Sequence, residues 1–134
     1  PAGKYAVGNV HGVDVTSTLG AQSELLDILL GACGDLRNVV ATAKEHYQGT
    51  CTLRFLMNDT DICILARNVI ILWMIVNEAP IACICAVWAH KLVTEQELGW
   101  VASSVDSLLK TIPSWLLVPT VTMISLKVRL LYMH

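Results

Sequence analysis

The sequence contains few charged residues, and this scarcity limits the partners it can have. Charged side chains make up 15% of the 134 residues, and the formal net charge is −2. Such a chain has no basic stripe with which to neutralise a phosphate backbone, so we expect no nucleic-acid partner. With 54% hydrophobic residues, the chain is too apolar to be disordered. Its length fits one domain or a piece of one.

Long uninterrupted apolar runs are also missing. The longest charge-free stretch near the middle is 68–77, and the run 111–126 is broken by Pro113 and Pro119. Neither reaches the roughly 20 predominantly apolar residues that cross a bilayer, so we expect no membrane association. The first residues lack the charged and apolar regions of a signal peptide. They also lack a starting Met. We therefore expect a cytoplasmic protein and a chain that is a fragment or a processed product.

The cysteines show no spacing typical of a metal site or of a disulfide framework. Their number is odd, no CxxC pair occurs, and Cys83-x-Cys85 with His90 is not a zinc spacing. We expect no metal site, and we expect buried, apolar thiols in a reducing compartment. The five cysteines are Cys33, Cys51, Cys63, Cys83 and Cys85.

The hydrophobic pattern of the first half predicts alternating strands and helices. Short apolar runs at 25–30 and 52–57, each ended by turn residues, predict buried strands. Segments 35–47 and 61–76 have helical periodicity, and the second is apolar on nearly all sides, which predicts a helix between a sheet and a further layer. This order is typical of a parallel, three-layer α/β unit. The residues expected on the inner stripe of the first helix are Leu36, Val39, Val40, Ala43 and Tyr47.

The second half predicts a helical continuation. Pro80 suits the first turn of a helix that extends to Leu92, and Thr94 and Glu97 form a capping box that opens another helix ending before Pro113. We expect residues 1–23 to be a lead-in loop and 24–110 the domain, with 111–134 left unassigned. The apolar face predicted for the last helix comprises Leu98, Val101, Val105, Leu108 and Leu109.

One turn carries the candidate binding site. Small residues between the first strand and first helix permit a tight turn and a close approach to the helix N-terminus. An acid near the end of the second strand is placed to accept hydrogen bonds from ribose hydroxyls. The Asp35 carboxylate would repel a bound pyrophosphate, which disfavours NAD and FAD as ligands. S-adenosylmethionine carries no phosphate and is disfavoured less. Alternatively, Asp35 stabilises the dipole of its own helix. The candidate cofactor-binding residues are Gly31, Ala32, Cys33, Gly34, Asp35, Asp59 and Asp61.

The segments 29–39, 58–61 and 65–68 together resemble one family. It is the uncharacterised domain found at the N-terminus of dynein axonemal assembly factor 3 and in some MYND-type zinc-finger proteins. The resemblance covers about residues 5–109 and implies a Rossmann-like fold similar to that of class I methyltransferases, used for assembly and interaction. Its motif residues outside the turn and the two acids are Asn9, Arg37, Asn38, Asn58, Arg67, Asn68 and Trp88.

Departures from the methyltransferase pattern shape the functional hypothesis. Ala32 stands where the resembled family has its first glycine, and Ile62 stands where that family has a proline. In the methyltransferase pattern, a third glycine would stand at Leu36 and an acid at Leu30. No catalytic motif is found, so we predict no catalytic residue and no cofactor. The expected function is a non-catalytic interaction or assembly scaffold with a protein partner. The alternatives are an S-adenosylmethionine-dependent methyltransferase and an obligate part of a larger assembly.

Overall fold

The computed structural model describes residues 10–19, 24–46, 51–89, 94–111 and 124–128. These residues form four helices and a three-stranded sheet with the order β1-β2-β3. Strands β1 (Leu25–Leu30) and β2 (Thr52–Met57) are parallel, in the register Leu25 to Thr52 through Leu30 to Met57. The bounds of both strands are those predicted, because each apolar run ends at a turn residue. The mixed α/β character and the parallel pair are confirmed.

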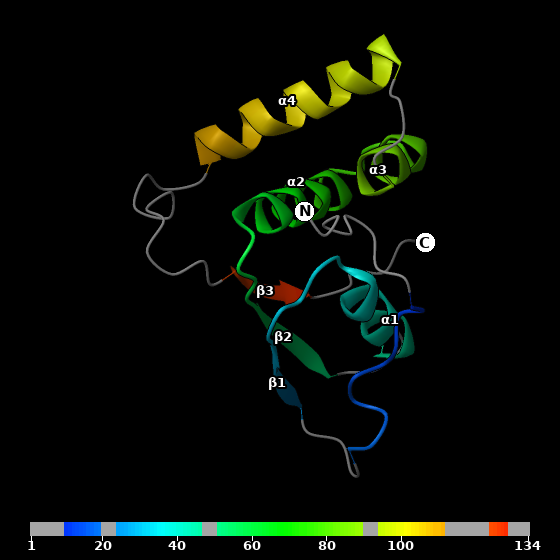
Figure 1. Ribbon diagram of the computed structural model, residues 1–134, viewed down its shortest axis with the longest axis vertical. Coiled ribbons are helices and arrows are strands. Elements are labelled where there is room, and N and C mark those ends of the chain that lie inside the picture. The colour runs from blue at the N-terminus through cyan, green and yellow to red at the C-terminus, as the bar shows by residue number, and fades with distance from the viewer. Residues whose placement is uncertain (1–9, 20–23, 47–50, 90–93, 112–123, 129–134) are drawn as a thin grey trace, which may run out of the picture.

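Strand β3 (Ile124–Val128) comes from the segment that the sequence left unassigned. It pairs antiparallel with β2, so that Val128 is the register partner of Leu53 and Ile124 that of Met57. The sheet is therefore mixed rather than wholly parallel. β2 is the central strand, and β1 lies at the edge (Figure 1).

Four helices follow the strands in the predicted places. They are α1 (Arg37–His46), α2 (Ile62–Val76), α3 (Ile81–Trp88) and α4 (Glu95–Thr111). Asp61 caps α2 by accepting a hydrogen bond from the Cys63 N–H at 2.9 Å. The capping box of α4 is confirmed: Thr94 Oγ1 accepts from the Glu97 N–H at 3.2 Å, and Glu97 accepts from the Thr94 N–H at 2.7 Å. Among the described residues, none of the helices has the length and apolar character needed to cross a membrane.

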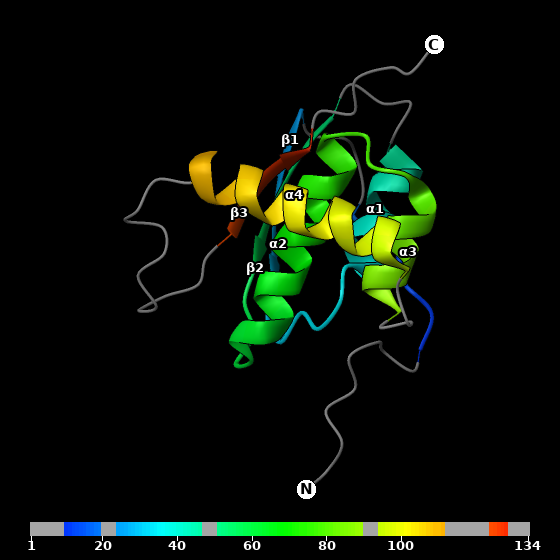
Figure 2. The same cartoon turned by 90° about the horizontal axis from the view of Figure 1, so that it is seen from above.

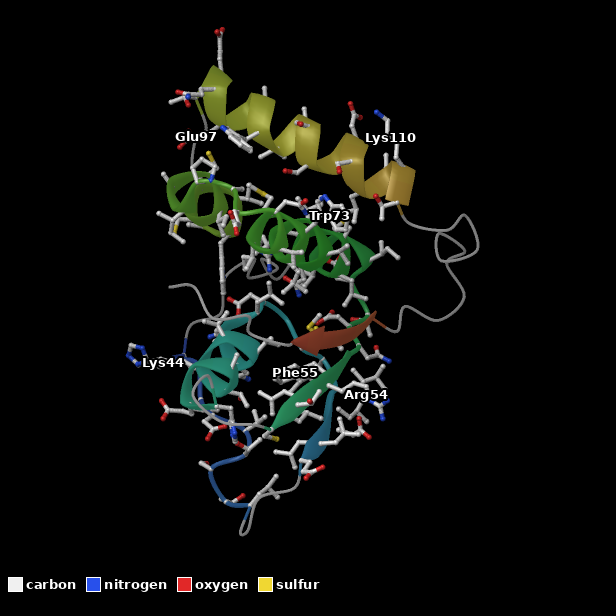
Figure 3. The ribbon with its side chains drawn as sticks, turned by 180° about the vertical axis from the view of Figure 1, so that it is seen from behind. Lys44, Arg54, Phe55, Trp73, Glu97 and Lys110 are labelled. Atoms are coloured by element: carbon white, nitrogen blue, oxygen red, sulfur yellow. The ribbon has the colours of Figure 1, made fainter. Side chains whose placement is uncertain are left out.

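The core lies on one face of the sheet. Leu53, Phe55 and Met57 of β2 are buried in a cluster with residues of α1, α2 and α3. Figure 3 shows Phe55 on the helix side of the sheet and Arg54 on the other side. Alternation along β2 produces this arrangement, because successive side chains of a strand point to opposite faces. In the described part of the chain, no helix covers the outer face, where Arg54 pairs with Asp27 of β1.

Helices α1, α2 and α3 contribute to the core on one face of the sheet, and α4 forms a further layer outside α2 and α3. Figures 1 and 2 show α4 crossing over α2 and α3 on the side away from the strands. The prediction that α2 lies between the sheet and a further layer is confirmed. Two predicted inner residues of α4, Leu98 and Leu109, are instead exposed. Ser104 and Leu108 of α4 are buried.

The buried and exposed isoleucines of α2 provide a matched test of this core. Replacing the fully buried Ile71 by alanine removes apolar contacts and leaves a cavity, so Ile71→Ala should lower the free energy of unfolding by about 2–5 kcal/mol. Ile75→Ala on the same helix, where the side chain is 43% exposed, should cost less than about 1 kcal/mol. Urea denaturation followed by circular dichroism measures both, and equal losses would contradict the packing described.

Candidate functional site

The candidate turn lies beside the loop that follows β2, because parallel strands bring their carboxyl ends to the same edge of the sheet. The Asn58 N–H donates to the Leu30 carbonyl oxygen at 2.9 Å, and the Cys33 N–H donates to the Asn58 carbonyl oxygen at 2.9 Å. The pairing of β1 and β2 thus continues past both strand ends. It brings together the turn 31–35 and the acids Asp59 and Asp61, as the sequence predicts.

Two residues of the turn adopt left-handed backbone conformations. The φ angle of Gly34 is +58° and that of Ala32 is +49°. Glycine adopts this region without steric cost, whereas the Cβ of alanine crowds the following carbonyl oxygen. Ala32 therefore strains the turn at the position where the resembled family has glycine.

Asp59 joins the two loops. Its Oδ2 accepts a hydrogen bond from the Gly34 N–H at 2.9 Å, and its Oδ1 accepts one from the Asp61 N–H at 3.0 Å. The carboxylate that the sequence assigns to a ribose thus binds the chain's own backbone. One of the donors is the turn N–H of Gly34, a group that a bound cofactor would otherwise use.

Asn68 of α2 holds the other side of Gly34. Its side chain is fully buried, and Nδ2 donates to the Gly34 carbonyl oxygen at 2.7 Å. The Oδ1 atom has no hydrogen-bond partner among the described residues. The preceding residue, Arg67, is also buried. Both backbone polar groups of Gly34 are therefore tied to other elements, the N–H to the β2–α2 loop and the carbonyl to α2.

Asp35 and Arg37 form a local pair at the start of α1. Asp35 Oδ1 accepts from the Arg37 N–H at 3.1 Å and from its Nε at 2.8 Å. Asp35 thus acts as a helix-start acid, which is the alternative reading given above. The Arg37 guanidinium also reaches the Val10 carbonyl oxygen in the lead-in segment.

The lead-in segment lies along a polar stripe of α1 that sequence reasoning missed. Asn38 Oδ1 accepts from the Val13 N–H at 3.1 Å, and Thr42 Oγ1 accepts from the Val15 N–H at 3.1 Å. His46 Nε2 lies 2.7 Å from Thr16 Oγ1. The spacing i, i+4, i+8 was the available signal. Our prediction favoured Val40, which is 44% exposed, whereas Thr42 is buried.

The Thr16 hydroxyl links Asp14 and His46. It donates to Asp14 Oδ1 at 2.7 Å, and its oxygen lies 2.7 Å from His46 Nε2. Although slight burial opposes the shift, hydrogen bonds from Thr16 and the charge of His46 hold the pKa of Asp14 below its ordinary value. The lead-in is thereby anchored to the C-terminal end of α1, at His46.

The Cys33 thiol lies near the carboxylates of Asp59 and Asp35 and is unreactive. Burial, followed by the carboxylates of Asp59 and Asp35, raises its pKa. A thiol with a raised pKa stays protonated at neutral pH and is a poor nucleophile. All five cysteines are free, but only Cys83 is buried as expected. Two are partly buried and two are exposed, namely Cys33 and Cys51, and Cys63 and Cys85. The described residues contain no group of three His, Cys, Asp or Glu side chains that could hold a metal ion.

The remaining motif residues do not join this site. Trp88 is half-buried and packs against the core from α3. Asn58 contributes through its backbone, as above, while its side chain is exposed. Asn9 lies outside the described residues.

Residues 6–93 match the family described as a domain of unknown function, DUF4470. This match covers well over half of the chain. The chain belongs to the DUF4470 family. No curated protein matches it, and no solved structure does. The DUF4470 span includes the turn, both joined loops and helices α1 to α3, but it ends before α4 and β3.

The strain at Ala32 can be measured directly. Ala32→Gly should raise the free energy of unfolding by about 1 kcal/mol, because glycine accepts the positive φ without steric cost. The same substitution at the exposed Ala102, in the interior of α4, should lower it by about 1 kcal/mol, because glycine is a poor helix former. Chemical denaturation of both variants tests the sign. A loss at Ala32 would contradict the left-handed conformation.

The structural role of Asp59 predicts a large cost for its removal. Asp59→Ala leaves two backbone N–H donors without their carboxylate and should destabilise the protein by about 2 kcal/mol or more. Asp59→Asn retains one acceptor oxygen and should cost less. Asp106→Asn on the exposed side of α4 is the matched control, with an expected change within about 0.5 kcal/mol. Thermal unfolding compares all three, and a neutral Asp59→Ala would show that the carboxylate has no structural role.

Proposed function

We propose that this DUF4470 chain is a non-catalytic, methyltransferase-like domain with a Rossmann-like fold that acts as a protein-interaction or assembly scaffold. The proposal includes a relationship to the N-terminal domain of dynein axonemal assembly factor 3 and to MYND-finger proteins. That relationship rests on the motifs at the turn, at the end of β2 and in α2. Localisation in the cytoplasm is part of the proposal and agrees with five free thiols.

The single observation that carries the proposal is the bond between Asp59 and the Gly34 N–H, 2.9 Å long. In a cofactor-binding unit of this kind, turn N–H groups and an acid after the second strand serve the ligand. Here these two groups bind each other. A cofactor that used the Gly34 N–H would first have to break this bond.

The charges and thiol around the turn support the same reading. Asp35 is buried and paired with Arg37, so it is not turned toward a ligand. Cys33 is kept protonated by burial and by neighbouring carboxylates, which raise its pKa. None of these groups is arranged as a nucleophile with its base.

A second candidate is an S-adenosylmethionine-dependent methyltransferase. One observation favours it: the buried Asn68 Oδ1, beside the turn, has no hydrogen-bond partner among the described residues. A ligand amino group could donate to such an oxygen. Under this alternative, residues 31–35 and Asp59 hold the cofactor.

Calorimetric titration of S-adenosylmethionine and S-adenosylhomocysteine into the full chain distinguishes the two candidates. We expect no heat of binding on a sample shown folded by circular dichroism, because the turn donor is already satisfied. Micromolar binding that is lost in Asp59→Asn and kept in Asp106→Asn would establish the alternative and refute the scaffold proposal.

A further inference from the structure

The lead-in segment is held on α1 through its backbone. Residues 10–19, here called the strap, contain neither helix nor strand and run beside α1 (Figure 1). The Val13 N–H donates to Asn38 Oδ1 at 3.1 Å. The Val15 N–H donates to Thr42 Oγ1 at the same distance. Because α1 accepts main-chain donors of the strap at two successive turns, the strap has one defined position along the helix.

Gly12 brings the strap against the first turn of α1. A Cβ atom at this position would lie 2.6 Å from the Arg37 carbonyl oxygen and 2.9 Å from the Arg37 carbonyl carbon. Both atoms belong to the helix backbone, which cannot move aside as the end of a flexible side chain can. Glycine permits this close approach of two backbones. A larger residue at position 12 must lift the strap from the helix.

Arg37 connects the strap to the turn after β1. Its guanidinium donates through Nη1 to the Val10 carbonyl oxygen of the strap, and through Nε to Asp35 Oδ1 at 2.8 Å. The donors of a guanidinium are fixed in one plane, so holding the group at Nη1 also orients Nε. The strap therefore helps to position the group that binds Asp35.

The bond to Asp35 reaches the centre of the turn within one residue. Asp35 follows Gly34, whose N–H donates to Asp59 Oδ2 at 2.9 Å. Asp35 is itself buried, and it also accepts from the Arg37 N–H at 3.1 Å. Hydrogen bonds to a buried carboxylate are costly to lose. The position of Asp35 thus depends on Arg37, and that of Gly34 depends on Asp35.

We propose that the strap is a latch for the turn 31–35. The docked strap holds Arg37 against Asp35, and the turn stays closed, with the Gly34 N–H bound to Asp59. When the strap lifts, the Arg37 guanidinium loses the Val10 carbonyl oxygen and regains rotamer freedom. It then binds Asp35 less tightly, so the bond between Gly34 and Asp59 opens more often. The coupling is reciprocal, so opening of the turn also loosens the strap.

The end of the strap near Arg37 is the part that lifts. The Val13 contact lies at the surface, and the side chains of Val10 and Val13 are exposed. The other end is held more firmly, because Thr16 is buried beside His46. Segments with few buried apolar contacts open at a low free energy, without unfolding of the core. The latch goes beyond the proposed function and does not depend on it, since the coupling is the same whether the released N–H meets water or a ligand.

Gly12→Ala lifts the strap without touching the turn. Amide hydrogen exchange of the full chain, followed by NMR, reads the two places separately. The Val13 N–H and the Gly34 N–H should each exchange faster by about fivefold or more, since each spends more time without its acceptor. Gly99→Ala on α4, where an added Cβ meets nothing within 4 Å, is the matched control and should change neither rate. Faster exchange at Val13 with an unchanged rate at Gly34 would overturn the latch.

The Phe55 N–H, in the central strand, is the reference for global unfolding. A smaller perturbation, Asn38→Ala, removes the acceptor of the Val13 N–H and leaves the Gly12 contact intact. It should speed exchange at Val13 and Gly34 and leave the rate at Phe55 unchanged. If Gly34 exchanges faster only together with Phe55 in both variants, the turn opens only with the whole fold, and the latch is refuted.

Arg37→Gln tests whether the coupling passes through the guanidinium. The contact of Gly12 is with the backbone of residue 37, so Gly12→Ala should still lift the strap and speed exchange at Val13 in this background. Its added effect at Gly34 should fall below about twofold, because the connecting group is gone. An undiminished effect at Gly34 would show that Arg37 does not carry the coupling, and the proposal would fail.

Discussion

The hydrogen bonds around Gly34 are the interaction on which the rest of the structure depends. The Asp59 carboxylate accepts the Gly34 N–H, and Asn68 donates to the Gly34 carbonyl oxygen. Three segments that are distant in sequence, namely the turn after β1, the loop after β2 and helix α2, are thereby fixed to one residue. Hydrogen bonds to a charged group contribute about 1.5–3 kcal/mol each, which is large compared with a typical domain stability of about 5–15 kcal/mol.

Local pattern predicted the elements, whereas their arrangement depended on contacts that no local pattern contains. The bounds of β1 and β2 follow from apolar runs that end at Gly31 and Asn58, and the α4 start follows from its capping box. β3 was missed because its partner, β2, lies far away in the sequence.

The sequence placed the turn and the acids after β2 near each other, but it did not determine what these residues bind. Gly34, Asp59 and Asp61 do meet, because parallel strands place their following loops together. A carboxylate that accepts backbone N–H groups and one that accepts ribose hydroxyls are the same residue type at the same spacing, so sequence cannot separate the two roles. The polar stripe of Asn38, Thr42 and His46 was overlooked for a related reason: its partners are backbone N–H groups and the hydroxyl of a segment that has no pattern of its own.

The turn after β1 and the position of β1 in the sheet both differ from those of a cofactor-binding unit. In a unit that binds a cofactor, the strand before the turn is central and the turn's donors are free. Among the residues that the structure describes, the Gly34 N–H of the turn is bonded to Asp59, and β1 stands at the edge of the sheet with none of its residues buried. The Leu29 side chain of β1 is 69% exposed. These two differences are the grounds on which we propose an assembly role in preference to catalysis.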